Sequence, residues 1–353
     1  MKAWVLHGPG DLRFEDVPEP YFANGDREKA IIRVKACGVC GSDIPRIFKT
    51  GAHRHPLIPG HEFAGEVVSV TEDTDPSLIG KRVGVFPLIP CKKCALCMDK
   101  KYEMCRDYDY PGSRSDGGFA EFVKVPVWNL IELPETVTFE TAAMLEPMAV
   151  AVHAIRQSGI DKEKEPGKAL VIGLGTIGLF IAMFLHGAGY SVIGIGNKEE
   201  QKKIFTGSGM REDRFIRSED SRNESTAGDS LSECKYIFEC VGKNESYEQA
   251  VSLASPGSTV VTVGNPASDM TLGREIYWKI LRNQLTIRGT WNSSFTHEPM
   301  DDWHYVLDVL SSGQITPEKM ISHRLRLKDL SEGLDIMKDK KEYYTKVMVT
   351  EFT

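Results

Sequence analysis

A glycine-rich turn between an apolar run and a helical pattern constrains the fold more than any other feature. Residues 169–172 are uninterruptedly apolar, and Gly173-Leu174-Gly175-Thr176-Ile177-Gly178 follows with the spacing G-x-G-x-x-G. In this context the glycines allow a tight turn, close approach of the backbone to a pyrophosphate, and close helix–strand packing. We therefore predict a dinucleotide site at Gly173, Gly175, Thr176, Ile177 and Gly178.

The segment around this turn alternates between strand and helix patterns. Apolar runs recur at 191–195, 236–240, 259–263 and 285–287, and a helical pattern covers 198–207. Such alternation is typical of a doubly wound parallel sheet, the Rossmann architecture. The polar stretch 218–232 has too few apolar residues for an amphipathic helix and is interpreted as a surface loop.

The end of the second predicted strand bears on the choice of dinucleotide. An NAD enzyme usually places a carboxylate there, to accept hydrogen bonds from the ribose. Here the position holds Gly196-Asn197-Lys198, which favours NADP, whereas Glu199 and Glu200 leave NAD open because either could reach back.

The first 130 residues have a different sequence pattern, without the alternation of strand and helix. Short β-rich runs at 31–36, 63–70, 82–86 and 119–125 lie between glycine and proline turns, as expected of a small antiparallel barrel. We predict a catalytic domain over 1–155 and a dinucleotide-binding domain over 156–290, with a charged joint at 161–167. The chain is expected to return to the catalytic domain over 291–353, with a helix near 303–310 and a last strand at 346–350.

Four cysteines are gathered within fifteen positions of the first domain. Cys91, Cys94 and Cys97 have two residues between successive thiols, and seven residues separate Cys97 from Cys105. This spacing is typical of a closed four-thiolate zinc site. A ferredoxin-type cluster would have a different last spacing, and disulfides need an oxidising compartment. We predict a structural zinc lobe over 87–110.

Composition excludes some classes of function. Hydrophobic residues make up 41% and charged residues 26%, as in ordinary soluble proteins, and the net charge of -7 disfavours nonspecific binding to nucleic acid or an acidic membrane. No apolar run reaches membrane-spanning length, and the N-terminal apolar run is too short for a signal-peptide core. We expect a cytoplasmic enzyme with neither nucleic-acid nor membrane partners.

Three further motifs appear in order along the chain. They are Cys37-Gly38-Val39-Cys40-Gly41-Ser42-Asp43, Gly60-His61-Glu62 and Leu145-Glu146-Pro147. Together with the four-cysteine lobe and the glycine turn, they resemble the zinc-dependent medium-chain alcohol dehydrogenases over the whole chain. Residues 41–53, 87–91 and 112–121 extend the resemblance to the polyol branch of that family. The resemblance implies a GroES-like barrel for the catalytic domain.

The resemblance also implies a second, catalytic zinc. Its ligands would be Cys40, His61 and Glu146, with Glu62 binding the metal directly or lying beside it, and Ser42 would carry the substrate proton. One thiolate, one imidazole and one carboxylate neutralise a zinc dication and leave an open position, as catalysis requires. Many relatives continue the proton relay through a histidine where this chain has Pro45, so here the proton must leave by ribose hydroxyls, water or another group.

The neighbouring residues have more than one interpretation. Cys37 is the alternative to Cys40 as a zinc ligand, but we expect it to pack inside the barrel. Cys234 and Cys240 are likewise expected to pack in the core of the other domain. Asp43 either orients a ligand or serves a turn. Lone histidines at 53, 55 and 153 are more typical of packed or surface imidazoles than of ligands.

The expected reaction is oxidation of a secondary hydroxyl of a sugar-alcohol phosphate with hydride transfer to NAD(P). Cations near the zinc motifs would hold the phosphate, and these are Arg46, Lys49, Arg54 and Arg114. Asn292 and Trp291 are candidates for the substrate cleft. An unphosphorylated polyol such as sorbitol, or threonine, is the alternative substrate. A non-catalytic zinc or nucleotide-binding protein is the third possibility. We expect a homodimer or homotetramer.

Overall fold

The structure, a computed structural model, describes residues 1–160, 166–222, 231 and 234–352. These residues divide into two compact units. Unit 1 contains Met1–Glu146, Ser294–Ser312 and Pro317–Thr353, and unit 2 contains Pro147–Ser293 and Gly313–Thr316. Most of the predicted 161–167 joint and of the predicted 218–232 loop lies outside the described residues, although Asp220–Arg222 forms a short 3-10 turn.

Unit 1 is built on a seven-stranded sheet with the order β14-β15-β3-β4-β5-β7, and β6 also pairs with β3. All of its pairs are antiparallel except β14 with β15. The strands are β3 (Lys29–Val39), β4 (Glu62–Val70), β5 (Arg82–Val85), β6 (Phe122–Pro126), β7 (Leu130–Glu132), β14 (Ile321–Arg326) and β15 (Lys346–Glu351). A separate hairpin joins β1 (Lys2–Gly8) to β2 (Asp11–Asp16).

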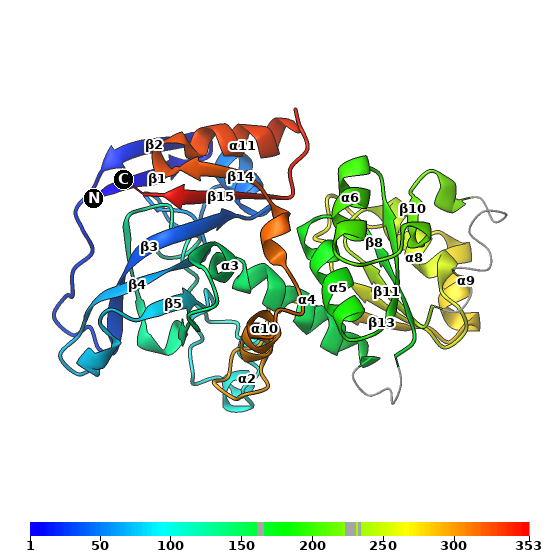
Figure 1. Ribbon diagram of the computed structural model, residues 1–353, viewed down its shortest axis with the longest axis horizontal. Helices are drawn as coiled ribbons and strands as arrows, with labels where there is room; N and C mark the ends of the chain where they lie inside the picture. The colour runs from blue at the N-terminus through cyan, green and yellow to red at the C-terminus, as the bar shows by residue number, and fades with distance from the viewer. Residues whose placement is uncertain (161–165, 223–230, 232–233, 353) are drawn as a thin grey trace. The chain divides into compact units, whose positions relative to one another are not determined.

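The longest strand shows why this sequence forms a half-buried sheet. Along β3, Ile32 and Val34 are fully buried and alternate with more exposed residues, as a strand with one face on a core requires. Cys37 is also fully buried on this strand, as expected of a packing residue. In Figure 1, β15 (red), from the end of the chain, lies beside β3 (blue).

Short helices connect the strands of unit 1. They are α1 (Asp43–Pro45), the adjoining turn η1 (Arg46–Thr50), α2 (Ala95–Met98), α3 (Phe139–Ala143), α10 (Asp302–Ser311) and α11 (Leu330–Asp339). The helix α4 (Leu145–Ser158) begins in unit 1 and continues into unit 2. Thr138 caps α3 by accepting a hydrogen bond from the Thr141 backbone, and Asp301 caps α10 in the same way through the backbone of His304.

Unit 2 is a six-stranded sheet with every pair parallel. Its order is β10-β9-β8-β11-β12-β13, so the strand order reverses between β8 and β11. The strands are β8 (Lys168–Ile172), β9 (Ser191–Gly196), β10 (Phe215–Arg217), β11 (Tyr236–Glu239), β12 (Thr259–Thr262) and β13 (Thr286–Gly289). This is the predicted doubly wound sheet, and its switch point is where such sheets bind ligands.

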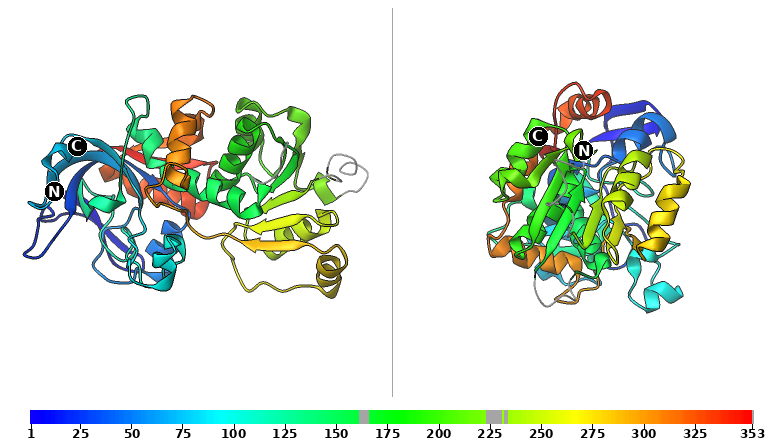
Figure 2. Two further views of the ribbon diagram at one scale, coloured as in Figure 1. Left: turned by 90° about the horizontal axis from the view of Figure 1, so that it is seen from below. Right: turned by 90° about the vertical axis from the view of Figure 1, so that its right-hand side faces the viewer.

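The helices of unit 2 are α5 (Thr176–Gly187), α6 (Glu199–Gly207), α8 (Asn244–Leu253) and α9 (Arg274–Arg282). Figure 2 shows the helices from the two halves of this unit, green and yellow, on opposite sides of the sheet. The core between them is aliphatic, with Leu170, Ile193, Ile237 and Val260 fully buried. Within the described part of the chain, no helix has the length and apolar character needed to cross a membrane.

Candidate active site

The sheet register brings the catalytic zinc motifs of unit 1 together. Cys40 follows β3, His61 and Glu62 stand where β4 begins, and Gly38 is paired with Glu62 across the two strands. Potential ligand atoms of Cys40, His61 and Glu62 all lie within 4.8 Å of one another. A Cβ atom at Gly38 would lie 2.3 Å from Glu62 Oε2, so glycine at this position leaves the space that the carboxylate occupies.

Asp43 is the fully buried partner of this group. Its carboxylate accepts hydrogen bonds from the Cys40 backbone at 3.0 Å and from Arg46 Nη1 at 2.7 Å. Its Oδ1 also lies 3.5 Å from His61 Nδ1, a buried nitrogen that has no other hydrogen-bond partner in the part of the chain that the structure describes. The other ring nitrogen, Nε2, is thus the one available to a metal.

The electrostatics of the group favour a cation. Burial lowers the pKa of His61, but the nearby Asp43 and Cys40 outweigh burial and raise this pKa well above its usual value. Burial also raises the pKa of Asp43, but His61 and Arg46 outweigh it and lower this pKa. A thiol, an imidazole and carboxylates in a site that favours positive charge are the donor set of a catalytic zinc.

Glu146, at the start of α4, lies nearby but outside the set of three. Its carboxylate is buried, and Tyr110 donates a hydrogen bond to Oε1 at 3.4 Å. The Tyr110 ring lies 5.5 Å from the His61 ring, so one tyrosine contacts both residues. Burial raises the pKa of Glu146 to about 7, with Glu62 adding to the effect and His61 and Lys346 opposing it. Ser42 Oγ lies 3.3 Å from Cys40 Sγ.

The candidate phosphate-binding cations differ in their surroundings. Arg46 is mostly buried and paired with Asp43, whereas Lys49 is exposed. The Arg114 guanidinium lies 4.5 Å from the centre of the Tyr108 ring, and its Nε is buried with no hydrogen-bond partner among the described residues. Burial, followed by the charges of Arg114 and Arg46, lowers the pKa of His53, so both guanidinium groups act on this one exposed imidazole.

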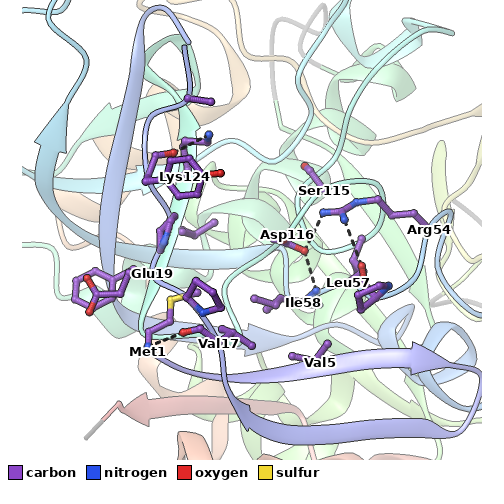
Figure 3. Close-up of a pocket in the computed structure, with 17 residues that line it drawn as sticks. Met1, Val5, Val17, Glu19, Arg54, Leu57, Ile58, Ser115, Asp116 and Lys124 are labelled. Atoms are coloured by element: carbon purple, nitrogen blue, oxygen red, sulfur yellow. Dashed lines mark hydrogen bonds and ion pairs between the residues drawn. The ribbon is translucent and has the colours of Figure 1, made fainter. Parts of the chain in front are cut away.

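Arg54 lines a separate cavity of about 510 Å³ in unit 1 (Figure 3). It donates to Asp116 Oδ1 at 3.0 Å, and Asp116 also accepts from the Ile58 backbone. The cavity wall is mainly apolar and includes none of the zinc-motif residues. The guanidinium of Arg54 therefore has a structural partner in a different place from the cysteine, histidine and glutamate group.

The four-cysteine lobe forms a second cluster. Ligand atoms of Cys91, Cys94, Cys97 and Cys105 all lie within 4.8 Å of one another. Hydrogen bonding from the Lys93 backbone lowers the pKa of Cys91 to about 6, whereas burial raises the pKa of Cys97 to about 12. Four converging thiols with no imidazole or carboxylate fit a closed structural zinc site, which would hold all four as thiolates.

The glycine turn of unit 2 has the geometry of a phosphate-binding loop. Gly173 has φ of +92°, and a Cβ there would lie 2.4 Å from Val241 Cγ2, so the turn packs against the end of β11. A Cβ at Gly178 would lie 2.0 Å from the Gly173 carbonyl oxygen. Position 178 therefore requires glycine if the helix is to pack this closely against the strand and its turn. Thr176 and Ile177 begin α5, and their backbone N–H groups face the loop end of the helix.

An arginine that sequence reasoning missed lies on the strand beside the end of β9. Arg217, on β10, is the register partner of Gly196 on β9 and forms an ion pair of 2.7 Å with Glu199. The Asn197 and Lys198 backbones both donate to Gln201 Oε1. No local pattern identifies Arg217, because the strand β10 has only three residues.

Other candidates are placed as follows. Asn292 lies in unit 2 after β13, with φ of 57° and its Oδ1 accepting from the Ser293 backbone, and Trp291 is exposed. Cys234 is fully buried, as predicted, and Cys240 is partly buried. Sequence reasoning also missed Tyr110 and the buried Lys346, which pairs with Glu62. The only sequence signal for Lys346 is a single cation that opens an apolar strand.

Two family models match the chain. The alcohol dehydrogenase GroES-like domain matches residues 26–135, and the zinc-binding dehydrogenase model matches residues 176–312. The predicted GroES-like and Rossmann fold classes are thereby confirmed.

Relatives and solved structures agree with these models. Galactitol 1-phosphate 5-dehydrogenase of Escherichia coli (strain K12) is 33% identical over 92% of each chain, and sorbitol dehydrogenase of Bombyx mori is 28% identical over 95% of each. The structure of galactitol-1-phosphate dehydrogenase from Escherichia coli has a TM-score of 0.89 at 30% identity, covering 99% of this chain and 100% of that one. A zinc-binding dehydrogenase from Sinorhizobium meliloti 1021 bound to NADP has a TM-score of 0.85 at 26% identity, covering 99% and 98%.

The predicted family is therefore confirmed, and with it an oxidoreductase that uses zinc and a nicotinamide cofactor. This chain belongs to the zinc-dependent medium-chain alcohol dehydrogenases, in their polyol branch.

Proposed function

We propose that this protein oxidises a secondary hydroxyl of a sugar-alcohol phosphate, of which galactitol 1-phosphate is the model, with hydride transfer to NADP. The observation that carries the phosphate assignment is Arg114. Its buried Nε is a donor with no acceptor among the described residues, and its charge lowers the pKa of His53, as does that of Arg46, which is itself paired with Asp43. A phosphate dianion would supply the acceptor that the Arg114 guanidinium lacks.

In this proposal Cys40, His61 and Glu146 hold the catalytic zinc, and the four-cysteine lobe holds the structural one. When bound, the catalytic zinc acts as a Lewis acid that lowers the pKa of the substrate hydroxyl. Ser42, whose Oγ lies beside Cys40 Sγ, accepts the hydroxyl proton and passes it outward. Asp43 keeps the His61 ring in one orientation through Nδ1.

The test is a dehydrogenase assay with galactitol 1-phosphate, galactitol, sorbitol and threonine. Arg114→Met should lower kcat/KM for the phosphate ester by roughly 10- to 150-fold, the size of one charge-assisted hydrogen bond, and leave sorbitol turnover unchanged. Arg54→Met is the matched control, because that guanidinium is paired with Asp116. Equal turnover of galactitol and its phosphate, or equal losses on both, would favour the unphosphorylated polyol.

The preference for NADP is proposed from the end of β9. No carboxylate stands at the strand end, and Arg217 is the register partner of Gly196. The Arg217 ion pair with Glu199 also neutralises one of the two carboxylates that favour NAD. Arg217→Ala should raise KM for NADP and lower KM for NAD, because the Glu199 carboxylate is then released to favour NAD. A wild-type preference for NAD contradicts the proposal.

Self-association is proposed through one face of unit 2. The edge strand β13 is exposed at all four residues, and on its other side it has no partner among the described residues. The neighbouring helix α9 buries none of its residues and exposes Tyr277, Trp278 and Leu281. An open strand edge beside exposed aromatic residues is self-complementary under a twofold axis, so a second copy of this chain is its proposed partner.

A further inference from the structure

Lys346 is a buried cation beside the candidate zinc ligands. It opens β15, where Val347 pairs with Val39 of β3, and only 3% of its side chain is exposed. Its Nζ lies 2.5 Å from Glu62 Oε2 and donates a longer hydrogen bond of 3.4 Å to the Val39 carbonyl. Burial of an unpaired ammonium group costs several kcal/mol, so this position tolerates lysine because Glu62 is there.

Glu62 is held equally tightly. Its side chain is 1% exposed, and the missing Cβ at Gly38 makes the space for Oε2. A carboxylate oxygen of Glu62 nevertheless lies within 4.8 Å of ligand atoms of both Cys40 and His61. Glu62 is therefore close enough to compete with a substrate hydroxyl for a metal held by those two residues.

Charge balance explains why the site has both groups. The Cys40 thiolate and the two glutamates, Glu62 and Glu146, bring three negative charges, which a zinc dication and the Lys346 ammonium balance. Asp43 and Arg46 balance each other separately. Without Lys346, Glu62 is an uncompensated buried anion whose nearest source of positive charge is the metal.

We propose that Lys346 is a positioning residue that holds the Glu62 carboxylate off the catalytic zinc and so preserves the open coordination position for the substrate hydroxyl. This inference rests on the proposed ligand set of Cys40, His61 and Glu146. Lys346 acts only through Glu62 and touches neither substrate nor cofactor.

The test is the metal coordination of Lys346→Met, measured without substrate. Cobalt replaces zinc in both sites, and the visible spectrum of Cys40→Ala, which retains only the four-cysteine site, is subtracted. We expect the bands of the wild type to shift, because the Glu62 carboxylate takes the open position of the four-coordinate site. Chelator competition should show tighter zinc binding by roughly ten-fold, the size of one added charge-assisted contact.

Two further variants separate positioning from general damage. Adding Glu62→Gln to Lys346→Met should restore the cobalt spectrum of the wild type, because the competing Glu62 anion is gone. Lys124→Met breaks another partly buried ion pair of unit 1, with Asp26, and should leave the spectrum unchanged. An unchanged or weaker affinity in Lys346→Met, or a spectrum that Glu62→Gln does not restore, overturns the inference.

A folding failure of Lys346→Met still leaves a decisive measurement. In the wild-type background, Glu62→Gln should leave the cobalt spectrum four-coordinate, since Glu62 is not a ligand there; loss of the bands overturns the inference. Should Cys40→Ala lose no metal relative to the wild type, the proposed zinc site itself fails. A wild type that loads this metal but turns over no polyol phosphate contradicts only the proposed substrate.

Discussion

Glu239 is predicted to support cofactor binding through the turn that follows β11. Its side chain is 2% exposed, and its Oε1 accepts hydrogen bonds from the Val241 and Gly242 backbones and from Ser246 Oγ, at 2.8, 2.9 and 2.8 Å. The turn so held packs against Gly173 of the phosphate-binding loop. Glu239→Ala removes all three hydrogen bonds at once.

The three lost hydrogen bonds do not cost the same. The hydrogen bond from the Val241 backbone is only partly buried, and Ser246 can turn its hydroxyl fully to the Lys243 carbonyl at 2.9 Å. Gly242 is buried, and its unpaired N–H costs about 1–3 kcal/mol. With the lost packing, we expect Glu239→Ala to destabilise unit 2 by about 2–3 kcal/mol, which lowers Tm by roughly 4–12 °C.

The same loss should appear in cofactor affinity. If binding has to reorder the turn at a cost of about 1–2 kcal/mol, Kd for NADPH rises roughly 5- to 30-fold. Fluorescence titration at 25 °C measures Kd, and differential scanning calorimetry measures Tm. Glu239→Gln keeps an acceptor oxygen and should lose less than half as much, and Glu245→Ala removes an exposed carboxylate of α8 as a control. A lowered Tm with an unchanged Kd would refute the role of this turn in cofactor binding.

The remaining predictions concern the metals, the coenzyme and the assembly. Cys97→Ser should lose one zinc and lower Tm before it lowers activity, whereas Cys40→Ser should lose one zinc and all turnover with Tm nearly unchanged. Metal analysis and calorimetry check both variants. The opposite pattern would mean that the structural and catalytic sites are exchanged. Asn197→Asp places a carboxylate at the end of β9 and should lower kcat/KM for NADP about ten-fold while raising that for NAD, measured by initial rates with each coenzyme. Trp278→Glu with Leu281→Glu should give a monomer with a native circular dichroism spectrum, and an unchanged mass by light scattering would exclude this face as the interface.

The sheets were predictable where burial leaves a strong pattern. The strand β8 is apolar from Ala169 to Ile172 because helices cover both faces of a parallel sheet, and β4 and β5 were expected from their β-rich runs. The hairpin β1–β2 was missed although Leu12 and Phe14 of β2 alternate with charged residues. Its first strand, β1, has four successive buried residues, Ala3 to Leu6, and so lacks the alternation of a half-buried strand. The strand β13 was expected only roughly, and its complete exposure could not be anticipated.

The site was predictable only as far as its motifs are local. Cys40 and His61 lie in short patterns, so the resemblance named them. Glu62 and Lys346 are 284 positions apart, and nothing in the sequence distinguishes a buried lysine from an exposed one. The same holds for Arg217, whose position beside Gly196 depends on strand register.

The place of β15 in its sheet has a consequence for biosynthesis. This strand fills the gap between β14 and β3, so the barrel of unit 1 stays incomplete until β15 has emerged from the ribosome. All strands of unit 2 precede β15 in sequence, and the dinucleotide-binding unit can therefore form first. Until β15 emerges, β3 presents an unpaired edge that could recruit other strands. Ribosomes stalled shortly before Lys346 should thus carry a nascent chain with a protease-resistant unit 2 and an open, chaperone-binding unit 1.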